Sequence, residues 1–487
     1  MITMNDCGQA GSYEYKGLST DTKPTNCAVN SLFLELDTGT FFYFDGTGWI
    51  PLKRGGGGGY SLFKSLIDRT VTEVTEEMTK NCATITACAF KDCKNLTKVK
   101  LHSDVVKTAY YSFRDCSSLS EVTFPTTGKF DEVEFGAFQN CTSLGEINIP
   151  SGTYRIGSYA FGHCSSATKL SLPNSITNIA DHTFEYCSQL YNITIPSSVE
   201  SIQDAAFQYC GESADVRTEL YIPENSVEYI GKYAFSHCSK LININIPTGV
   251  LTLDASAFQY CSRAETLSLP HTLTKLGDRC FANCSSLNAK VTIPSSLSGK
   301  EAWVGSSFRE CTSLVDVYIE NGVSRIGDYT FFGCTSLKNI NFPESLGEAS
   351  NPGNIGDHAF ENCTSLEIIM VDTGVRHIGA SAFEGCSNLR TVVLPSTISN
   401  NTDSLGIGSR AFYYGQNYSK GLNEIKIYAT VPPTIGKDAF KIWYTSGGSG
   451  GALPLVPYPN IKVPHNSVQA YKDASAWADY KDRIQSM

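Results

Sequence analysis

The chain is 487 residues long, which is too long for one ordinary compact core and predicts several domains or a repeat array. Its formal net charge is −10, and no cluster of Lys and Arg could neutralise a phosphate backbone, so we expect neither nucleic acid nor an anionic membrane surface as a partner. No apolar run reaches the ~18 residues that a membrane-spanning helix needs, so we expect no membrane insertion.

Residues 1–54 lack the pattern that fills the rest of the chain, and we predict that they form a small β-rich docking module. Apolar and polar residues alternate over residues 31–37, 40–44 and 49–52, and glycine-containing turns separate these three runs. The spacing predicts a small β-meander. Five consecutive glycines at 55–59 predict a flexible linker after it.

Residues 60–464 carry a repeat, I-G-x-x-A-F-x-x-C-x-x-L-x-x-I-x-I-P, whose phenylalanine recurs about every 23 residues. Thirteen of these phenylalanines are followed three residues later by a cysteine, from Cys93 to Cys386. Such a period predicts a solenoid of about 15 coils. The phenylalanines are Phe90, Phe113, Phe138, Phe161, Phe184, Phe207, Phe235, Phe258, Phe281, Phe308, Phe331, Phe360, Phe383, Phe412 and Phe440.

Each part of the repeat predicts a local structure. Leu-x-x-Ile-x-Ile-Pro, as in residues 144–150, alternates apolar positions and predicts a short strand that the proline ends. Ile-Gly, as in Ile156-Gly157, predicts a turn, and Ala-Phe-x-x-Cys predicts a helical turn or irregular segment with the ring and the thiol inside. Because one coil cannot bury its own apolar edge, we expect stacked coils of an α/β solenoid, with a parallel sheet on one face.

The C-terminal residues 465–487 are predicted to form a helical cap over the last coil. The repeats lose their pattern after Phe412, and a glycine-rich stretch at 447–451 predicts a flexible insertion. Within the predicted cap, four apolar residues follow a helix-like spacing: Tyr471, Trp477, Tyr480 and Ile484.

The repeat resembles the BspA-type leucine-rich repeat, a family of bacterial and protist surface proteins associated with adhesion. The resemblance extends from about residue 70 to about residue 464 and rests on the motif A-F-x-x-C-x-x-L-x-x-I-x-I-P. It implies the fold and a role in binding, but it implies no particular ligand, because such solenoids serve many partners.

The cysteines indicate the cellular compartment in which the chain folds. Neighbouring coils should hold the repeat cysteines about 4.8 Å apart with parallel Cβ vectors, which does not suit a disulfide, so we expect a ladder of buried thiols that behave as small hydrophobes. Such a ladder and the absence of a secretory signal in residues 1–17 favour folding in the cytosol. A zinc site at Cys82, Cys88 and Cys93 is the alternative to a capping coil, but their spacing is not that of metal ligands.

Catalytic motifs are missing from the sequence. Two Asp-Thr-Gly triplets at 37–39 and 372–374 cannot form an aspartic-protease pair, because a flexible linker separates the parts of the chain that carry them. No H-E-x-x-H or P-loop sequence is present. We therefore expect no enzyme, no catalytic residue, no cofactor and no metal.

Two surfaces are candidates for binding, and no single ligand-binding residue can be assigned. One surface is the row of outward-facing strand residues, which a merely solvated sheet would explain equally well. The other consists of insertions between coils, where Trp303 is a candidate for stacking on a sugar. The outward-facing residues are Lys100, Thr123, Asn148, Ser171, Thr194, Tyr221, Asn245, Ser268, Thr292, Tyr318 and Asn341. The insertions are residues 211–217, 298–303, 347–353, 399–405, 415–420 and 445–455.

The N-terminal module decides the predicted function. Residues 16–25, 33–39 and 43–46 resemble a short module of phage and prophage structural proteins. The resemblance implies a phage or prophage tail-fibre or baseplate protein for host recognition, made in the host cytoplasm and built into the virion. Its partners would be phage tail or baseplate proteins and a host cell-surface protein or glycan, and fibre analogy leaves a homo-oligomer open. The alternative is a BspA-like adhesin of the bacterial cell surface.

Overall fold

The computed structural model describes two compact units, Met1–Val216 and Arg217–Met487. The described residues are 3–6, 13–17, 23, 32–35, 40–44, 49–51, 69–127, 129–214, 216–299, 302–303, 305–346, 355–398, 406–415, 422–443 and 459–487. The predicted linker at 55–59 and the insertion at 447–451 lie outside these ranges.

The N-terminal strands form a five-stranded sheet in the order β1-β2-β3-β4-β5. The predicted meander corresponds to β3 (Leu32–Glu35), β4 (Thr40–Phe44) and β5 (Trp49–Pro51), which pair antiparallel. Two further strands, β1 (Thr3–Asp6) and β2 (Tyr13–Gly17), were not predicted, and β2 pairs parallel to β3. These strands extend the meander into a larger sheet.

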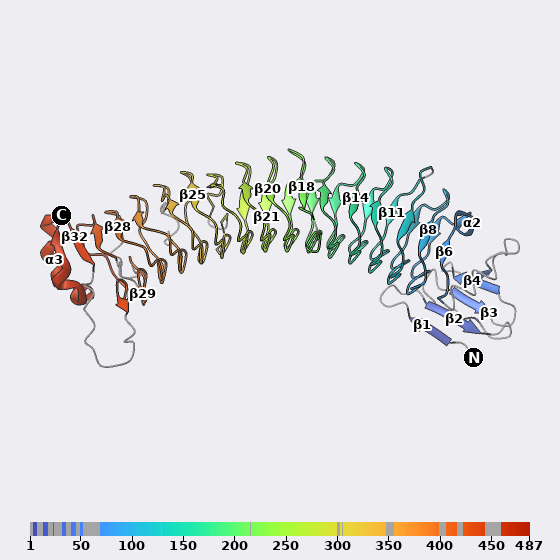
Figure 1. Cartoon of the computed structure of the whole chain (residues 1–487), viewed down its shortest axis with the longest axis horizontal. Helices are drawn as coiled ribbons and strands as arrows, with labels where there is room; N and C mark the ends of the chain where they lie inside the picture. The colour runs from blue at the N-terminus through green and yellow to red at the C-terminus, as the bar shows by residue number, and fades with distance from the viewer. Residues whose placement is uncertain are drawn as a thin grey trace. The chain divides into compact units, whose positions relative to one another are not determined.

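The repeats fold into the predicted solenoid, and in each unit successive strands lie side by side in chain order (Figure 1). A first series of strands comes from the Leu-x-x-Ile-x-Ile part of the repeat, and we call it the long-strand series. In the first unit it consists of β6 (Glu73–Val74), β8 (Lys98–Lys100), β10 (Glu121–Thr123), β12 (Glu146–Asn148), β14 (Lys169–Ser171) and β16 (Asn192–Thr194). In the second unit it consists of β18 (Glu219–Tyr221), β20 (Asn243–Asn245), β22 (Thr266–Ser268), β24 (Val291–Ile293), β25 (Asp316–Ile319), β26 (Asn339–Ile340), β27 (Ile368–Met370), β28 (Thr391–Leu394), β30 (Glu424–Ile427) and β32 (Asn460–Val463).

A second series of short strands lies where the sequence predicts Ile-Gly turns, so that prediction was wrong. In the first unit these strands are β7 (Thr84–Ile85), β9 (Lys107–Thr108), β11 (Glu132–Val133), β13 (Arg155–Ile156), β15 (Asn178–Ile179) and β17 (Ser201–Ile202). In the second unit they are β19 (Tyr229–Ile230), β21 (Thr252–Leu253) and β23 (Lys275–Leu276), and the series continues as isolated bridges at Trp303, Ile326, Ile355, Ile378, Ile407 and Ile435. Two other short strands, β29 (Tyr414–Gly415) and β31 (Ile442–Trp443), lie just after Phe412 and Phe440 and pair with each other. The glycine is needed here for close approach and not for turning: a Cβ on Gly379 would lie 2.5 Å from the carbonyl carbon of Gly356 in the preceding coil.

The Ala-Phe-x-x-Cys segment is a series of turns and not a helix. The residues two before and two after Phe161, Tyr159 and His163, have φ angles of 57° and 62°. Left-handed residues at this spacing interrupt a right-handed helix. Their N–H groups instead donate to the next coil, from Tyr159 to Asp181 O at 3.1 Å and from His163 to Glu185 O at 2.6 Å. The backbone of this segment is therefore hydrogen-bonded between coils.

The core is a stack of phenylalanine rings along the solenoid. Phe113 lies 4.9 Å from Phe90 and 5.0 Å from Phe138, centroid to centroid, with the rings nearly parallel. Most of the repeat thiols beside the rings are hydrogen-bonded to the preceding coil, as Cys141 Sγ is when it donates to Phe113 O at 3.2 Å. Stacking and burial of these rings stabilise the packing of coil on coil, because the ring of each coil contacts the rings of the two adjacent coils.

The C-terminal segment contains η1 (His465–Ser467), α3 (Val468–Asp473), η2 (Ser475–Arg483) and the strand β33 (Ile484–Ser486). Tyr471, Trp477 and Tyr480 are buried, and Trp477 Nε1 donates to Pro433 O at 3.0 Å. β33 adds to β32 as a parallel strand. The final residues thus both cover the core and extend the sheet. Among the described residues, no helix has the length and apolar character to cross a membrane.

Candidate binding surface

Most strands of the long-strand series expose their first and third residues, and we call this surface the outward face; in β24 the positions are shifted by one, so that Val291 and Ile293 are buried and Thr292 lies on this face. In most strands the second residue points into the core, as Ile147 and Ile244 show by being buried. Of the predicted outward-facing residues, most are exposed and only Thr123, Thr292 and Asn341 are half-buried. The alternation follows from the two-residue period of a strand, which sends neighbouring side chains to opposite faces.

In the first unit, opposite charges on the outward face lie in register. Glu121 pairs with Lys98 across β10 and β8, with Lys98 Nζ 2.9 Å from Glu121 Oε2. Glu146 pairs with Lys169 across β12 and β14, with Lys169 Nζ 2.7 Å from Glu146 Oε1. The hydrogen bond from Lys169 lowers the pKa of the Glu146 carboxyl and raises that of the lysine. Both pairs are exposed, so salt screens them and they stabilise the fold only weakly.

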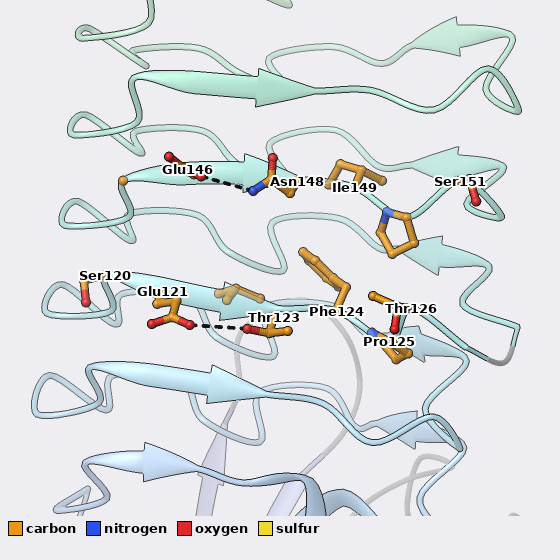
Figure 2. A pocket seen from close by; sticks show the side chains of 13 residues that line it. Ser120, Glu121, Thr123, Phe124, Pro125, Thr126, Glu146, Asn148, Ile149 and Ser151 are labelled. Atoms are coloured by element: carbon orange, nitrogen blue, oxygen red, sulfur yellow. Dashed lines mark hydrogen bonds between the residues drawn. The ribbon is translucent and has the colours of Figure 1, made fainter.

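A groove lies between the two charged pairs, at the junction of β10 and β12 (Figure 2). These two strands belong to different sheets, β10 with β8 and β12 with β14, so their facing edges do not form a ladder. The groove is lined along its length by residues 120–126 of one coil and by Gly145, Glu146 and residues 148–151 of the next. Its floor is apolar, because Phe124 and Ile149 are buried, and its rim is polar.

The outward face of the second unit carries aromatic rings. Tyr221 on β18 is 60% exposed and Tyr318 on β25 is 45% exposed. The Lys290 ammonium lies 5.0 Å from the centroid of the Tyr318 ring, a cation–π contact. Exposed rings beside small polar residues are suited to protein or glycan contacts.

An apolar part of the outward face escaped the sequence prediction. Ile368 and Met370 on β27 are both exposed. They occupy the first and third strand positions, which other coils fill mostly with polar residues. The signal was present in the sequence as Ile-Ile-Met, where the alternation of apolar and polar residues fails.

Trp303, predicted to be an exposed platform for a sugar, is 1% exposed, and that prediction was wrong. Its ring packs edge-on against Phe331, with 6.0 Å between centroids, and its backbone bridges to Leu276 of the preceding coil. The residue lies five positions before Phe308, as Ile326 lies five before Phe331. Trp303 therefore occupies the core position of the isoleucine in the short-strand series.

The insertions contribute little to the described surface. Residues 347–353, 399–405 and 445–455 lie outside the described ranges, as does most of 415–420. The insertions at 211–217 and 298–303 are described in part, and Val216 in the first is exposed. Their role in binding stays a prediction.

The buried thiols are not a reactive site. Burial raises the pKa of Cys141, Cys164 and Cys261 well above the ordinary thiol value, so the nucleophilic thiolate is disfavoured. At the zinc alternative, Cys88 and Cys93 are buried in the first coil and Cys82 is half-buried. Within the described ranges, no group of three or more His, Cys, Asp or Glu side chains is arranged to hold a metal ion.

The sequence matches the model of the BspA type leucine-rich repeat region over residues 83–214, 216–304 and 303–442. The structure is similar to that of a leucine-rich repeat protein from Bacteroides ovatus, with 22% identity, a TM-score of 0.56, and coverage of 100% of this chain and 98% of that one.

Two weaker similarities have TM-scores below 0.5. A leucine-rich cell surface protein from Faecalibacterium prausnitzii has 21% identity and a TM-score of 0.40, covering 88% of this chain and 94% of that one. The pneumococcal vaccine antigen PcpA has 15% identity and a TM-score of 0.39, covering 94% and 97%. No protein of curated function matches the sequence.

Proposed function

Because the chain belongs to the BspA-type leucine-rich repeat family, a family of non-enzymatic repeat proteins, we propose that it is an adhesion protein of a bacterial cell surface. It would bind a host protein or glycan through the outward face of its long-strand series. The observation that supports this role is the outward face itself, where residues in register expose charged, polar and aromatic side chains over many coils.

The buried thiols are compatible with a location outside the cell. A thiol that is buried and has a raised pKa reacts slowly with oxidants and disulfides. Cys164 shows the arrangement: its side chain is fully covered, and Sγ donates to Phe138 O at 3.4 Å. Folding in the cytosol is therefore compatible with a folded protein that stays outside the cell.

The virion role is the second proposal, and it is supported by the resemblance of residues 16–25, 33–39 and 43–46 to phage structural proteins and by the expected folding of the thiol ladder in the cytosol. The family match begins at residue 83 and does not include these residues. The two proposals differ in where the protein is found, which makes them separable.

Antibodies raised against the full chain provide the test. On intact cells of the bacterium that makes the protein, they should label the surface, and added protease should remove the signal. Latex beads coated with the full chain should adhere to cultured host epithelial cells more than albumin-coated beads do. Label confined to purified virions would instead favour the phage role, and beads that do not adhere would contradict an adhesin.

A further inference from the structure

We propose that the groove between β10 and β12 binds an extended peptide segment that carries a basic side chain. This rests on the proposed binding function and names a class of partner for one part of the outward face. The groove follows one coil over seven consecutive residues, 120–126, of which Glu121–Thr123 form β10. At about 3.3 Å per residue the strand part is about 10 Å long, and the coil beyond it continues the groove, which suits a short linear segment.

Charge specifies what lies in the middle of the groove. Across the four strands β8, β10, β12 and β14, the outward residues are Lys98, Glu121, Glu146 and Lys169. Each glutamate is paired with a lysine on its outer side, and the two glutamates lie on the neighbouring strands β10 and β12, which do not pair with each other. Like charges on adjacent strands disfavour close pairing, and a cation between them relieves the repulsion.

Both carboxylates are held in place for such a cation. Glu121 Oε2 contacts Lys98, and its Oε1 accepts a hydrogen bond from Thr123 Oγ1 at 3.4 Å. Glu146 Oε1 contacts Lys169, and its Oε2 accepts one from Asn148 Nδ2 at 3.3 Å. Figure 2 shows these two hydrogen bonds on neighbouring strands of the groove. Each carboxylate retains acceptor capacity, since an ionised carboxylate has about four lone-pair sites.

The apolar floor specifies the flanking residues. Phe124 and Ile149 lie three residues beyond the two glutamates, on the same two coils. A peptide with a lysine between the glutamates therefore places an apolar side chain over these residues. The occupant is a strand with a basic residue flanked by apolar ones, which is a recurring mode of peptide recognition on sheets.

The experiment uses the full chain and the fluorescein-labelled peptide Leu-Thr-Lys-Thr-Leu, whose symmetry covers both chain directions. Fluorescence polarisation at low salt should show binding that weakens as salt rises. The same peptide with Glu in place of Lys should not bind. Glu121→Gln and Glu146→Gln should each weaken binding about fivefold, because each removes one exposed charge contact.

Glu219→Gln is the matched control, since Glu219 is an exposed glutamate at the first position of β18, away from the groove. It should leave binding unchanged. The double variant Glu121→Lys, Glu146→Lys should reverse the preference toward the Glu peptide, and circular dichroism should show its fold unchanged.

Three results would overturn the proposal: no binding of the Lys peptide, equal weakening by Glu219→Gln, or displacement of the peptide by cadaverine at equal concentration. The last would indicate a small-cation site. If coated beads still adhere to cells when the peptide fails, the peptide groove is wrong and the adhesion function stands. If the peptide binds and the beads do not adhere, the peptide groove stands and the adhesion function is wrong.

Discussion

At the scale of single residues, the stability of the solenoid depends on rings and glycines that touch the neighbouring coil. Phe258 stacks on Phe235 at 5.1 Å and on Phe281 at 5.7 Å, and it is fully buried. Its ring therefore contacts the coils on both sides of its own coil.

Phe258→Ala should lower the free energy of unfolding by about 3–5 kcal/mol, because the lost ring leaves a cavity between two others. Urea denaturation followed by circular dichroism measures this. The exposed Ser268→Ala serves as the control and should change stability by less than about 0.5 kcal/mol. A loss below about 1 kcal/mol at Phe258 would contradict the ring stack as the core.

Gly379→Ala tests the close approach of coils. The added Cβ would lie 2.5 Å from Gly356 C and 2.6 Å from Asp357 N, both backbone atoms that cannot move independently. We expect a loss of about 1–3 kcal/mol through overpacking. Gly152→Ala is the matched control, because its added Cβ would lie at an ordinary 3.5 Å from Phe130 O. It should leave the free energy of unfolding unchanged. Equal effects of the two changes would refute a steric role for the short-strand glycine.

At the scale of elements, the thiol ladder couples stability to pH. Burial raises the pKa of thiols such as Cys141 and Cys363 in the folded chain, whereas in the unfolded chain they ionise near pH ~8.5. The unfolded state then binds fewer protons above that pH, so the stabilisation is present below it and decreases as pH rises.

Between pH 8.5 and 10, in the presence of a reductant, each buried thiol should remove up to about 1.4 kcal/mol of stability per pH unit. Thermal unfolding as a function of pH measures the slope. Replacing Cys141, Cys164 and Cys363 with alanine should make it shallower. Stability that is constant over this range would contradict burial of the ladder.

The C-terminal segment should act as a cap over the last coils. Trp477 is fully buried against Phe440, at 6.0 Å between centroids, and donates to Pro433 O. Trp477→Ala should speed hydrogen exchange in β30 and β32 but not in β24 and β25, because repeat contacts are between neighbours. Uniform exchange changes along the second unit would mean that the unit unfolds as one body.

At the scale of the whole molecule, the solenoid could be predicted from the sequence because the core residues recur with the period of the repeat. The spacing of Phe and Cys determines which side chains are inside, and the strand alternation determines the outward face. The prediction was wrong at residues whose type fits two different structures. The Ile-Gly pair predicts a turn but lies at a short strand, and Trp303 predicts an exposed loop residue but lies in the core. Counting back from Phe308 would have placed Trp303 in the core.

The groove between β10 and β12 could not be predicted from the repeat. Glu121 and Glu146 each look like ordinary solvated strand residues, and only the structure shows that β10 and β12 do not pair and that both residues line one groove. The domain boundaries, including the docking module at 1–54 and the cap at 465–487, remain predictions. Which partner the outward face selects depends on side chains that the fold leaves free to vary.

Binding through the outward face can be tested by substituting the tyrosines exposed on it. Tyr221 and Tyr318 are 60% and 45% exposed on that face, while Tyr154 and Tyr233 are 56% and 44% exposed outside the long-strand series. Adhesion of coated beads to host cells should fall about tenfold or more for Tyr221→Ser with Tyr318→Ser, as expected for aromatic contacts at an interface. The matched pair Tyr154→Ser with Tyr233→Ser should adhere like the unchanged protein. Loss of adhesion with the second pair and not with the first would contradict the outward face as the binding surface.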